Sequence, residues 1–442
     1  MSGKDLVLLA KRISERSVKG EIDTARKIFD EMPHRDCITW NVMLKSYIEN
    51  HRISDAQDMF ERMHEKNTVS WNSMIMAYAR ERKMHIALKL FSIMPDKDVT
   101  SWTTIISGLS RDRQITDAWR LFKLMPEPNS ISWSAIISGF QQNGLASKTL
   151  ILFRQMLSVG IRPTPHSFTS VFTASADVAA HSIGQQLYSQ CIKAGFEGNT
   201  CVGNSAISMF VKSGNLDFAR GISEGLPQPD IITWNSMIVG YGQNGYAVES
   251  ILVFHQMQKT HFLPDSISFL GVLQGCSHRG LVEEAIQYFK NMKMDYGISP
   301  GPEHYACIVD VLSRAGFVKE ALMIVMKMPF EPVAIFWRTL LNGCKIWGDL
   351  KLGMFAAARV LDLEPHSSSA CLMAIEIYSS VGRSADALDM RRRMNQREAK
   401  KEISYSWVDI NGKVPLFTTR DETHAESENI YNTLELLYYD MQ

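Results

Sequence analysis

The residues best suited to catalysis lie near the C-terminus, where a single residue separates His424 from Glu426. Zinc-dependent deaminases use this His-x-Glu spacing, with the histidine on the metal and the glutamate as proton carrier. They also need a Pro-Cys-x-x-Cys segment, and no cysteine follows Cys371. None of the seven cysteines forms a Cys-x-x-Cys pair, which disfavours a zinc site or a disulfide framework and favours a reducing compartment. We therefore assign no catalytic residue, metal ligand or cofactor, and we predict that the chain is not an enzyme.

A second set of polar residues recurs in one phase of the sequence. Asparagine occupies this phase four times, and an aspartate or asparagine lies 26 or 30 residues after each of them. Amide and carboxylate side chains can hydrogen-bond a polar ligand. The alternative is that each asparagine lies at the start of a helix and only caps it. The recurrence favours a shared binding role. The four asparagines are Asn41, Asn72, Asn204 and Asn235.

An internal repeat must position these residues. Tryptophan recurs at intervals of 31 residues, and the same register then continues in steps of 31 to 36 residues. A series of small residues and a series of methionines keep the same phase. The register positions are Trp40, Trp71, Trp102, Trp133, Phe168, Gly203, Trp234, Phe269, Tyr305 and Trp337. The other two series begin with Ala25, Ala56 and Ala87 and with Met32, Met63 and Met94.

Each unit of the repeat predicts two helices. The first opens at the aromatic residue, as in TWNVMLKSYIEN, and the second follows the pattern A-x3-F-x2-M, both with helical spacing of apolar positions. Glycines such as Gly144 and Gly214 lie between the two, where a left-handed helix end needs no Cβ. The aromatic and methionine series are interpreted as core. A single pair cannot bury its apolar face, so we predict an all-α, right-handed α-solenoid superhelix of tandem helix-turn-helix repeats, with the first helices lining its concave surface.

The amino-acid composition limits the classes of function that this chain can have. Hydrophobic residues make up 45% of the 442 residues and charged residues 21%, which is typical of a folded chain. Lys plus Arg equals Asp plus Glu, so no global field attracts nucleic acid or membrane. No apolar run is long enough to span a bilayer, and we predict no membrane contact. The acidic residues Asp5 and Glu15 disfavour an organellar presequence at this N-terminus.

These repeats resemble those of the pentatricopeptide repeat proteins of plant organelles. The alternating lengths of 31, 35 and 36 residues are similar to the PLS subclass, in which short and long repeats interleave with standard ones. The resemblance implies a degenerate N-terminal repeat at residues 1–36 and nine repeats of S, P and L type at 37–333. TPR-like E1 and E2 motifs follow at 334–400, and the start of a diverged E extension lies at 401–442.

The resemblance is sharpest near the C-terminus. GVLQGCSHRGLVEEAIQYFKNMKMDYGI and PEHYACIVDVLSRAGFVKEALMIVMKMPFEP are similar to the penultimate and last repeats of the family, and FWRTLLNGCKIWGDLKLGMFAAARVLDLEP and CLMAIEIYSSVGRSADALDMRRRM to E1 and E2. These motifs imply a site-recognition factor for organellar C-to-U RNA editing. Because the chain lacks the DYW deaminase domain, the implied partners are a DYW-type deaminase in trans and multiple organellar RNA editing factors. The segment around His424 is similar to one upstream of that domain, but Arg420 and Ala425 replace its Gly and Pro.

In this family each repeat reads one nucleotide, with the residue after the register position and the last residue of the unit. Hydroxyl and amide groups can bond the edge of a splayed base. The family code assigns U to Asn with Asp, A to Thr with Asn, and a pyrimidine to Asn with Asn. It implies the target 5′-Y-U-A-N-(A)-U-U-N-N, with the chain's N-terminus toward the RNA 5′ end and an edited C about four nucleotides beyond the last repeat's nucleotide. The carried-over pairs are Asn41 with Asn67, Asn72 with Asp98, Thr103 with Asn129, Ser134 with Thr164, Thr169 with Asn199, Asn204 with Asp230, and Asn235 with Asp265.

Two further pairs of the same kind, Leu270 with Gly301 and Ala306 with Val333, offer no amide and specify no base. The family also sandwiches each base between residues that lie two positions before the register residue. The sandwiching positions are Ile38, Val69, Thr100, Ile131 and Ile232.

A basic run near the C-terminus is either a phosphate contact or, as we favour, a solvated helix face. It consists of Arg391, Arg392, Arg393, Lys400 and Lys401.

Two other functions stay open. A protein-binding helical scaffold agrees with the zero net charge, but a protein groove has no reason to repeat an Asn–Asp pair. An RNA stability, splicing or translation factor is the other alternative, and the E1 and E2 resemblance disfavours it. The family implies an organelle, and we favour the mitochondrion over the chloroplast.

Overall fold

The computed structural model describes residues 3–178, 181–365, 368–380, 382–396, 406–407 and 416–417. Within them the chain forms helices α1 to α24 and one short antiparallel strand pair, with Ser406 opposite Phe417 and Trp407 opposite Leu416. The predicted all-α solenoid class is confirmed. The helices that begin before residue 180 are α1 Gly3–Val18, α2 Ile22–Asp30, α3 Cys37–Glu49, α4 Ile53–Arg62, α5 Thr68–Arg80, α6 Met84–Ile93, α7 Val99–Arg111, α8 Ile115–Leu124, α9 Ser130–Gln142, α10 Ala146–Ser158 and α11 Pro165–Asp177.

The second half continues the alternation of first and second helices. Its elements are α12 His181–Lys193, α13 Thr200–Lys212, α14 Leu216–Gly225, α15 Ile231–Gln243, α16 Ala247–Gln258, α17 Ser266–Arg279, α18 Val282–Met294, α19 Pro302–Arg314, α20 Val318–Lys327, α21 Ala334–Trp347, α22 Leu350–Leu363, α23 Ser368–Ser380, α24 Ser384–Gln396, β1 Ser406–Trp407 and β2 Leu416–Phe417.

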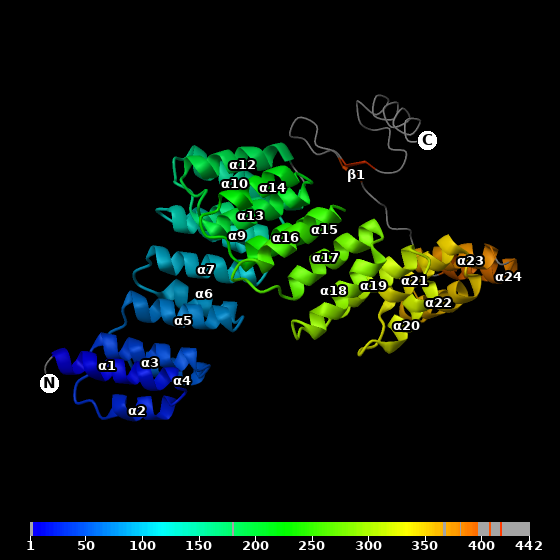
Figure 1. Cartoon of the computed structure of the whole chain (residues 1–442). Coiled ribbons are helices and arrows are strands. Elements are labelled where there is room, and N and C mark those ends of the chain that lie inside the picture. Colours follow the sequence, from blue (N-terminus) through cyan, green and yellow to red (C-terminus); the bar gives the residue numbers. More distant parts are fainter. Residues whose placement is uncertain are drawn as a thin grey trace. The chain divides into compact units, whose positions relative to one another are not determined.

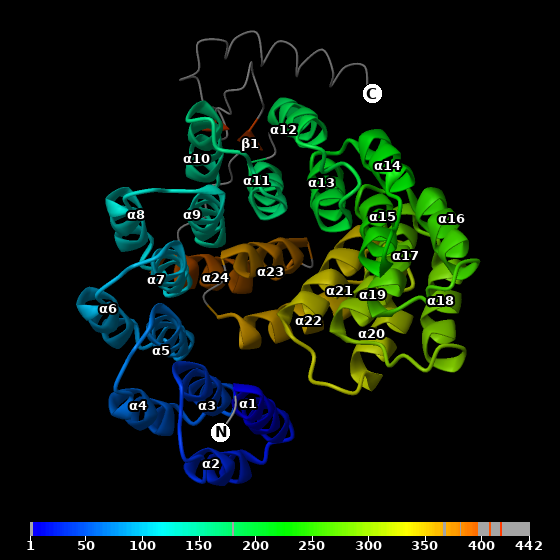
Figure 2. The same ribbon diagram turned by 90° about the vertical axis from the view of Figure 1, so that its left-hand side faces the viewer.

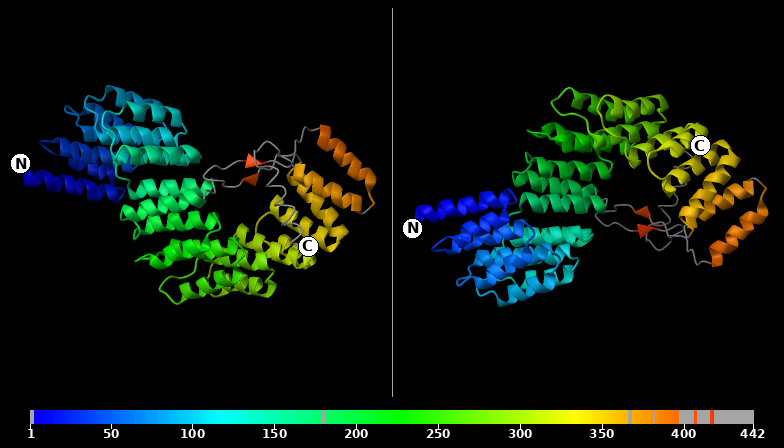
Figure 3. Two further views of the ribbon diagram at one scale, coloured as in Figure 1. Left: turned by 90° about the horizontal axis from the view of Figure 1, so that it is seen from above. Right: turned by 90° about the horizontal axis from the view of Figure 1, so that it is seen from below.

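The chain divides into two compact units. The first unit comprises residues 1–178 with 190–194, and the second comprises 179–189 with 195–442. Each is a stack of antiparallel helix pairs (Figures 1 and 3). None of the helices that the structure describes is long and apolar enough to cross a bilayer. His424, Glu426, Lys400 and Lys401 lie outside the described residues.

Within each unit the first helices form a continuous row. In the first unit α3, α5, α7, α9 and α11 pack in succession, and each second helix packs on the first helix of its own repeat and on the next (Figure 2). The second unit repeats this arrangement with α13, α15, α17, α19 and α21. Residues at one position of successive first helices are therefore neighbours.

The first helices begin earlier than the sequence predicts. We expected each to open at the aromatic residue, but α3 begins at Cys37 and α5 at Thr68, three residues before Trp40 and Trp71. The reason is the N-cap, because Asn67 accepts a hydrogen bond from the Ser70 N–H and satisfies an otherwise unpaired donor of the first turn. The last residue of one unit thus caps the first helix of the next.

The predicted core series are buried. Ala25, Ala56 and Ala87 lie where the two helices of a pair meet, and Met32 and Met63 are buried at the ends of their units. Each register tryptophan in the first unit packs against the preceding phenylalanine in an edge-to-face arrangement. These contacts support the interpretation of the aromatic series as packing residues in the first unit, where Trp40, Trp71 and Trp102 are half-buried.

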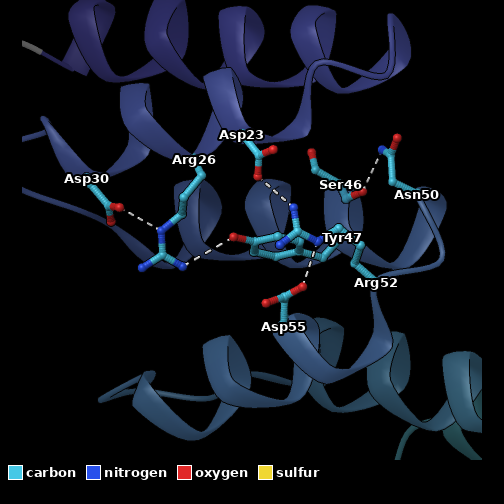
Figure 4. Close-up of polar contacts among 8 residues, drawn as sticks. All are labelled: Asp23, Arg26, Asp30, Ser46, Tyr47, Asn50, Arg52 and Asp55. Atoms are coloured by element: carbon cyan, nitrogen blue, oxygen red, sulfur yellow. Dashed lines mark hydrogen bonds and ion pairs between the residues drawn. The ribbon is translucent and has the colours of Figure 1, made fainter.

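Ion pairs join the first helix pair to the next repeat (Figure 4). The Arg52 guanidinium donates to Asp23 and to Asp55, each at 2.6 Å, so it links α2 to α4. Arg26 bonds Asp30 at 2.7 Å and lies 3.4 Å from the Tyr47 hydroxyl oxygen. The first helix pair, α1 and α2, is therefore joined to the next repeat by ion pairs as well as by apolar packing.

Candidate functional site

The predicted reading residues come from two adjacent repeats. The first member of each pair lies one turn inside a first helix, as Asn72 does in α5, and the second member is the N-cap of the next first helix, as Asp98 is for α7. Successive first helices are packed neighbours. The cap therefore faces the asparagine of the preceding repeat, although 26 residues separate them in the chain.

Five of the predicted pairs are joined directly by hydrogen bonds. An asparagine amide N–H donates to the cap oxygen in four pairs, and two hydroxyl groups meet in the fifth. The distances are 3.1 Å from Asn41 Nδ2 to Asn67 Oδ1, 3.1 Å from Asn72 Nδ2 to Asp98 Oδ1, 2.7 Å between Ser134 Oγ and Thr164 Oγ1, 2.9 Å from Asn204 Nδ2 to Asp230 Oδ1, and 3.0 Å from Asn235 Nδ2 to both Asp265 carboxylate oxygens.

Two predicted pairs are arranged differently. The Thr103 hydroxyl donates to backbone oxygens of its own helix, while the Asn129 side chain accepts from the N–H groups of Ile131 and Ser132. Thr169 likewise donates within its helix, to His166 O, and belongs to the first unit, whereas Asn199 belongs to the second. A threonine hydroxyl in a helix readily bonds a carbonyl of the preceding turn, which removes its donor from the cap.

The capping alternative applies to only one member of each pair. Asn41, Asn72, Asn204 and Asn235 are not helix starts, since each lies in the second turn of its helix. Their partners are the caps, and each uses one side-chain oxygen to accept the backbone N–H. The two roles coexist, because a carboxylate has further lone pairs for a second donor.

Hydrogen bonding sets the charge state of two caps. Burial raises the pKa of Asp98, but hydrogen bonds from Ser101 and Asn72 outweigh it and hold that pKa below its usual value. Burial also raises the pKa of Asp230, and the bonds from Thr233 and Asn204 lower it further than burial raises it. Both carboxylates are therefore ionised at neutral pH and act as acceptors.

The expected base-sandwiching positions are exposed. Ile38 is 64% exposed and Ile131 61%, although both are large apolar side chains in the first turn of a helix. Val69, Thr100 and Ile232 are exposed too. Exposed apolar side chains recurring next to polar pairs are suited to contact a flat ring. Ile267, at the same position of α17 and 52% exposed, was missed because its repeat offers no base-specifying pair.

Sequence reasoning also missed the hydroxyl before each register residue. Thr233 Oγ1 donates to Asn204 Oδ1 at 2.7 Å, and Ser268 Oγ donates to Asn235 Oδ1 at 2.5 Å. The recurrence of Ser or Thr at this position, as in Thr39, Ser70 and Ser101, is visible in the sequence. It does not reveal which hydroxyl turns toward the neighbouring repeat.

In the part of the chain that the structure describes, no group of three or more His, Cys, Asp or Glu side chains could hold a metal ion. Burial raises the pKa of the Cys276, Cys307 and Cys344 thiols to about 12, so these thiols are poor ligands. The paired side chains described above instead offer hydrogen-bond donors and acceptors.

Comparison with known families places these repeats. The family model described as PPR repeat matches residues 38–68, 69–99, 100–129, 131–161, 267–296 and 303–331, and the PPR repeat family model matches residues 229–278. The matched segments include both members of most of the hydrogen-bonded pairs.

Relatives in Arabidopsis thaliana carry the same repeats. The chain is similar to pentatricopeptide repeat-containing protein At2g13600, with 34% identity over 299 residues that cover 66% of this chain and 43% of that protein. It is also similar to a putative pentatricopeptide repeat-containing protein, At3g11460, mitochondrial, with 36% identity, 67% of this chain and 48% of that protein. The chain therefore spans less than half the length of these curated relatives.

A solved structure shares the fold. Pentatricopeptide repeat protein PPR10 in complex with an 18-nt psaJ RNA element aligns with a TM-score of 0.74 and 18% identity, covering 89% of this chain and 61% of that chain.

Proposed function

Because this chain belongs to the pentatricopeptide repeat proteins, we propose that it binds single-stranded RNA and reads one base at each paired position. The observation that carries the proposal is the set of five hydrogen-bonded side-chain pairs, which join successive first helices at one position of the repeat. Hydrogen bonding orients these groups before a ligand arrives. The solved PPR10 complex, in which a protein of this fold holds an 18-nt RNA, supports the proposal.

The Asn–Asp pairs suit uracil. In Asn72 with Asp98, one amide hydrogen is used between the two side chains, which leaves a second amide hydrogen and carboxylate lone pairs. Uracil presents the complementary pattern, an N3–H donor beside carbonyl acceptors. Asn204 with Asp230 and Asn235 with Asp265 have the same groups. Exposed Ile38, Val69, Thr100, Ile131 and Ile232 would then pack on the base faces.

We propose further that the RNA is organellar and that the chain selects a C-to-U editing site. The support is the alternation of repeat lengths and the segments similar to E1 and E2, which form the helical pairs α21–α22 and α23–α24. A DYW-type deaminase in trans and multiple organellar RNA editing factors would be the partners. The mitochondrion is favoured as the compartment.

A mobility-shift titration tests the base reading. We expect the chain to bind a single-stranded RNA carrying 5′-YUANAUU and to lose on the order of 1–3 kcal/mol for each of the last two U that is changed to A. The double variant Asn235→Thr with Asp265→Asn should transfer the preference at the seventh nucleotide from U to A. Equal binding to both RNAs, or none, would contradict base reading and favour the protein-binding scaffold.

A native thiol gives an independent control. Cys201 is exposed in the first turn of α13, at the same position as the exposed isoleucines, whereas Cys276 and Cys344 are buried. We expect bound RNA to slow alkylation of Cys201 several-fold while leaving the buried thiols unreactive throughout. Labelling of Cys201 at an unchanged rate in a saturated complex would place the RNA elsewhere.

A further inference from the structure

Two hydroxyl groups in the second unit cross the boundary between repeats. Thr233 in α15 donates to Asn204 Oδ1 of α13, and Ser268 in α17 donates to Asn235 Oδ1 of α15. Both hydroxyl-bearing residues are buried, with 1% and 0% exposure. Each asparagine is therefore held at both ends of its amide, because its Nδ2 donates to Asp230 or Asp265.

The equivalent serine of the first unit bonds elsewhere. Ser101 lies at the same position of α7, and its hydroxyl donates to Asp98 Oδ1 of its own cap at 2.7 Å. Thr233 and Ser268 also reach their own cap oxygens at 3.0 Å, but their shorter bonds go to the asparagine of the preceding repeat. The amide oxygen of Asn72 is buried and has no hydrogen-bond partner, and the same is true of Asn41. The Asn72 amide is held by its cap alone, and the Asn41 amide is held by its cap and by a weak bond to Cys37 Sγ at 3.8 Å.

The two arrangements fix the amide differently. A carboxylate can only accept, so the amide nitrogen must face the aspartate in both units. A second bond to the amide oxygen further opposes a half-turn of the amide group in Asn204 and Asn235. In Asn72, where the amide oxygen has no partner, only the bond to Asp98 opposes the same half-turn.

We propose that Thr233 and Ser268 are specificity-determining residues that make Asn204 and Asn235 present an N–H donor alone. This inference rests on the proposed RNA reading and deepens it. Uracil O4 accepts that N–H, whereas cytosine carries a donating amino group at the same position. An amide fixed at both ends therefore rejects cytosine more strongly than an amide that its cap alone holds.

The unmodified protein already provides one comparison. Asn72 with Asp98 is expected to read the second nucleotide of YUANAUU, and the pairs that begin with Asn204 and Asn235 the sixth and seventh. The preference for U over C should be greater at the sixth and seventh nucleotides than at the second by roughly fivefold, the factor carried by one net hydrogen bond.

Removal of single hydroxyls tests the cause. Ser268→Ala should reduce the U-to-C preference at the seventh nucleotide roughly fivefold, and Thr233→Val should do the same at the sixth, while Thr233→Ser retains it. Ser101→Ala is the matched control. It removes the same group from the same helical position and from a similar capping box, so it should cost similar stability yet leave the preference at the second nucleotide unchanged.

The outcomes separate this inference from the proposed function. If the protein binds YUANAUU with base preference but Ser268→Ala and Thr233→Val leave the U-to-C ratios unchanged, the inference is wrong and the reading function stands. An equal loss of preference in Ser101→Ala would show that capping alone matters and would also overturn it. If the unmodified protein shows no base preference, both fall together.

Discussion

Two helix interfaces, which we call joints, show different ways of packing one repeat on the next. One lies between α5 and α7 in the first unit, and the other lies between α15 and α17 in the second. In the first unit, a Cβ at Gly108 of α7 would lie 3.0 Å from the Ala79 side chain of α5, and the rings of Phe91 in α6 and Trp102 in α7 are nearly perpendicular with centroids 4.9 Å apart. In the second unit, a Cβ at Gly242 would lie 2.1 Å from the carbonyl oxygen of Gly271. One joint is made by side chains, whereas the other is made partly by backbone.

This difference shows that repeats of the same fold need not tolerate changes of side-chain volume equally well. Side chains can shift to new rotamers, so a joint like α5–α7 can absorb small changes of volume. Backbone cannot move without shifting the whole helix. Gly242 and Gly271 are therefore required by close approach, and the proposed reading pair of Asn235 and Asp265 belongs to that rigid joint.

The largest effect should come from Gly242→Ala. The new methyl group would collide with the Gly271 backbone, so we expect the free energy of unfolding of the second unit to fall by about 3 kcal/mol or more. Amide hydrogen exchange localised to α15–α18 would measure it. Gly221→Ala is the control, because nothing lies within 4 Å of that Cβ in α14, and it should raise stability by up to about 1 kcal/mol. Equal effects of the two changes would show that the close approach is not real.

Breaking an aromatic joint in the first unit should cost less. Phe60→Leu removes the edge contact with Trp71 at 4.9 Å but leaves a large apolar side chain, so we expect a loss of about 1–3 kcal/mol. Exchange in α4–α7 would report it. Ile93→Ala, on the exposed face of α6, should change stability by less than about 0.5 kcal/mol.

The residues with left-handed backbone at the ends of the first helices also differ between the two units. Arg82 and Arg113 have φ of 58° and 62°, where later repeats carry Gly214 and Gly245. A non-glycine residue is strained in this region, so Arg82→Gly should stabilise the first unit by about 0.5–1 kcal/mol, and Gly214→Ala should destabilise the second by a similar amount. Thermal unfolding followed by circular dichroism would measure both. A loss of stability in Arg82→Gly would show that the arginine side chain matters more than its backbone.

The smallest effect should be on acid stability. The pKa values of Asp98 and Asp230 are lowered in the fold, so their contribution is present above their unfolded value of about 3.9 and is lost as pH falls through the lowered folded values. Asp98→Asn retains a good cap but cannot titrate. Its unfolding free energy should therefore fall less steeply below pH 4 than that of the unmodified protein, as measured by urea titrations at several pH values. Parallel profiles would argue against the Asp98 contribution.

The sequence alone determined the repeat, because its signal is periodic. Packing two helices in every unit demands small, aromatic and methionine residues at fixed intervals, and these residues are visible without coordinates. The resemblance to a known repeat family then assigned both members of each predicted reading pair to fixed positions within that period. It could not place the helix starts, since the caps Asn67 and Asp98 read equally well as loop residues.

Only the tertiary structure decided how the paired residues use their hydrogen bonds. Thr103 and Asn129 have suitable groups but bond within their own helices, whereas Ser268 and Thr233 reach across to another repeat. Each hydroxyl has one hydrogen and several acceptors within reach, and its choice depends on distances of a few tenths of an ångström between helices. A sequence specifies which groups are available, but the packing of neighbouring repeats decides which of them meet.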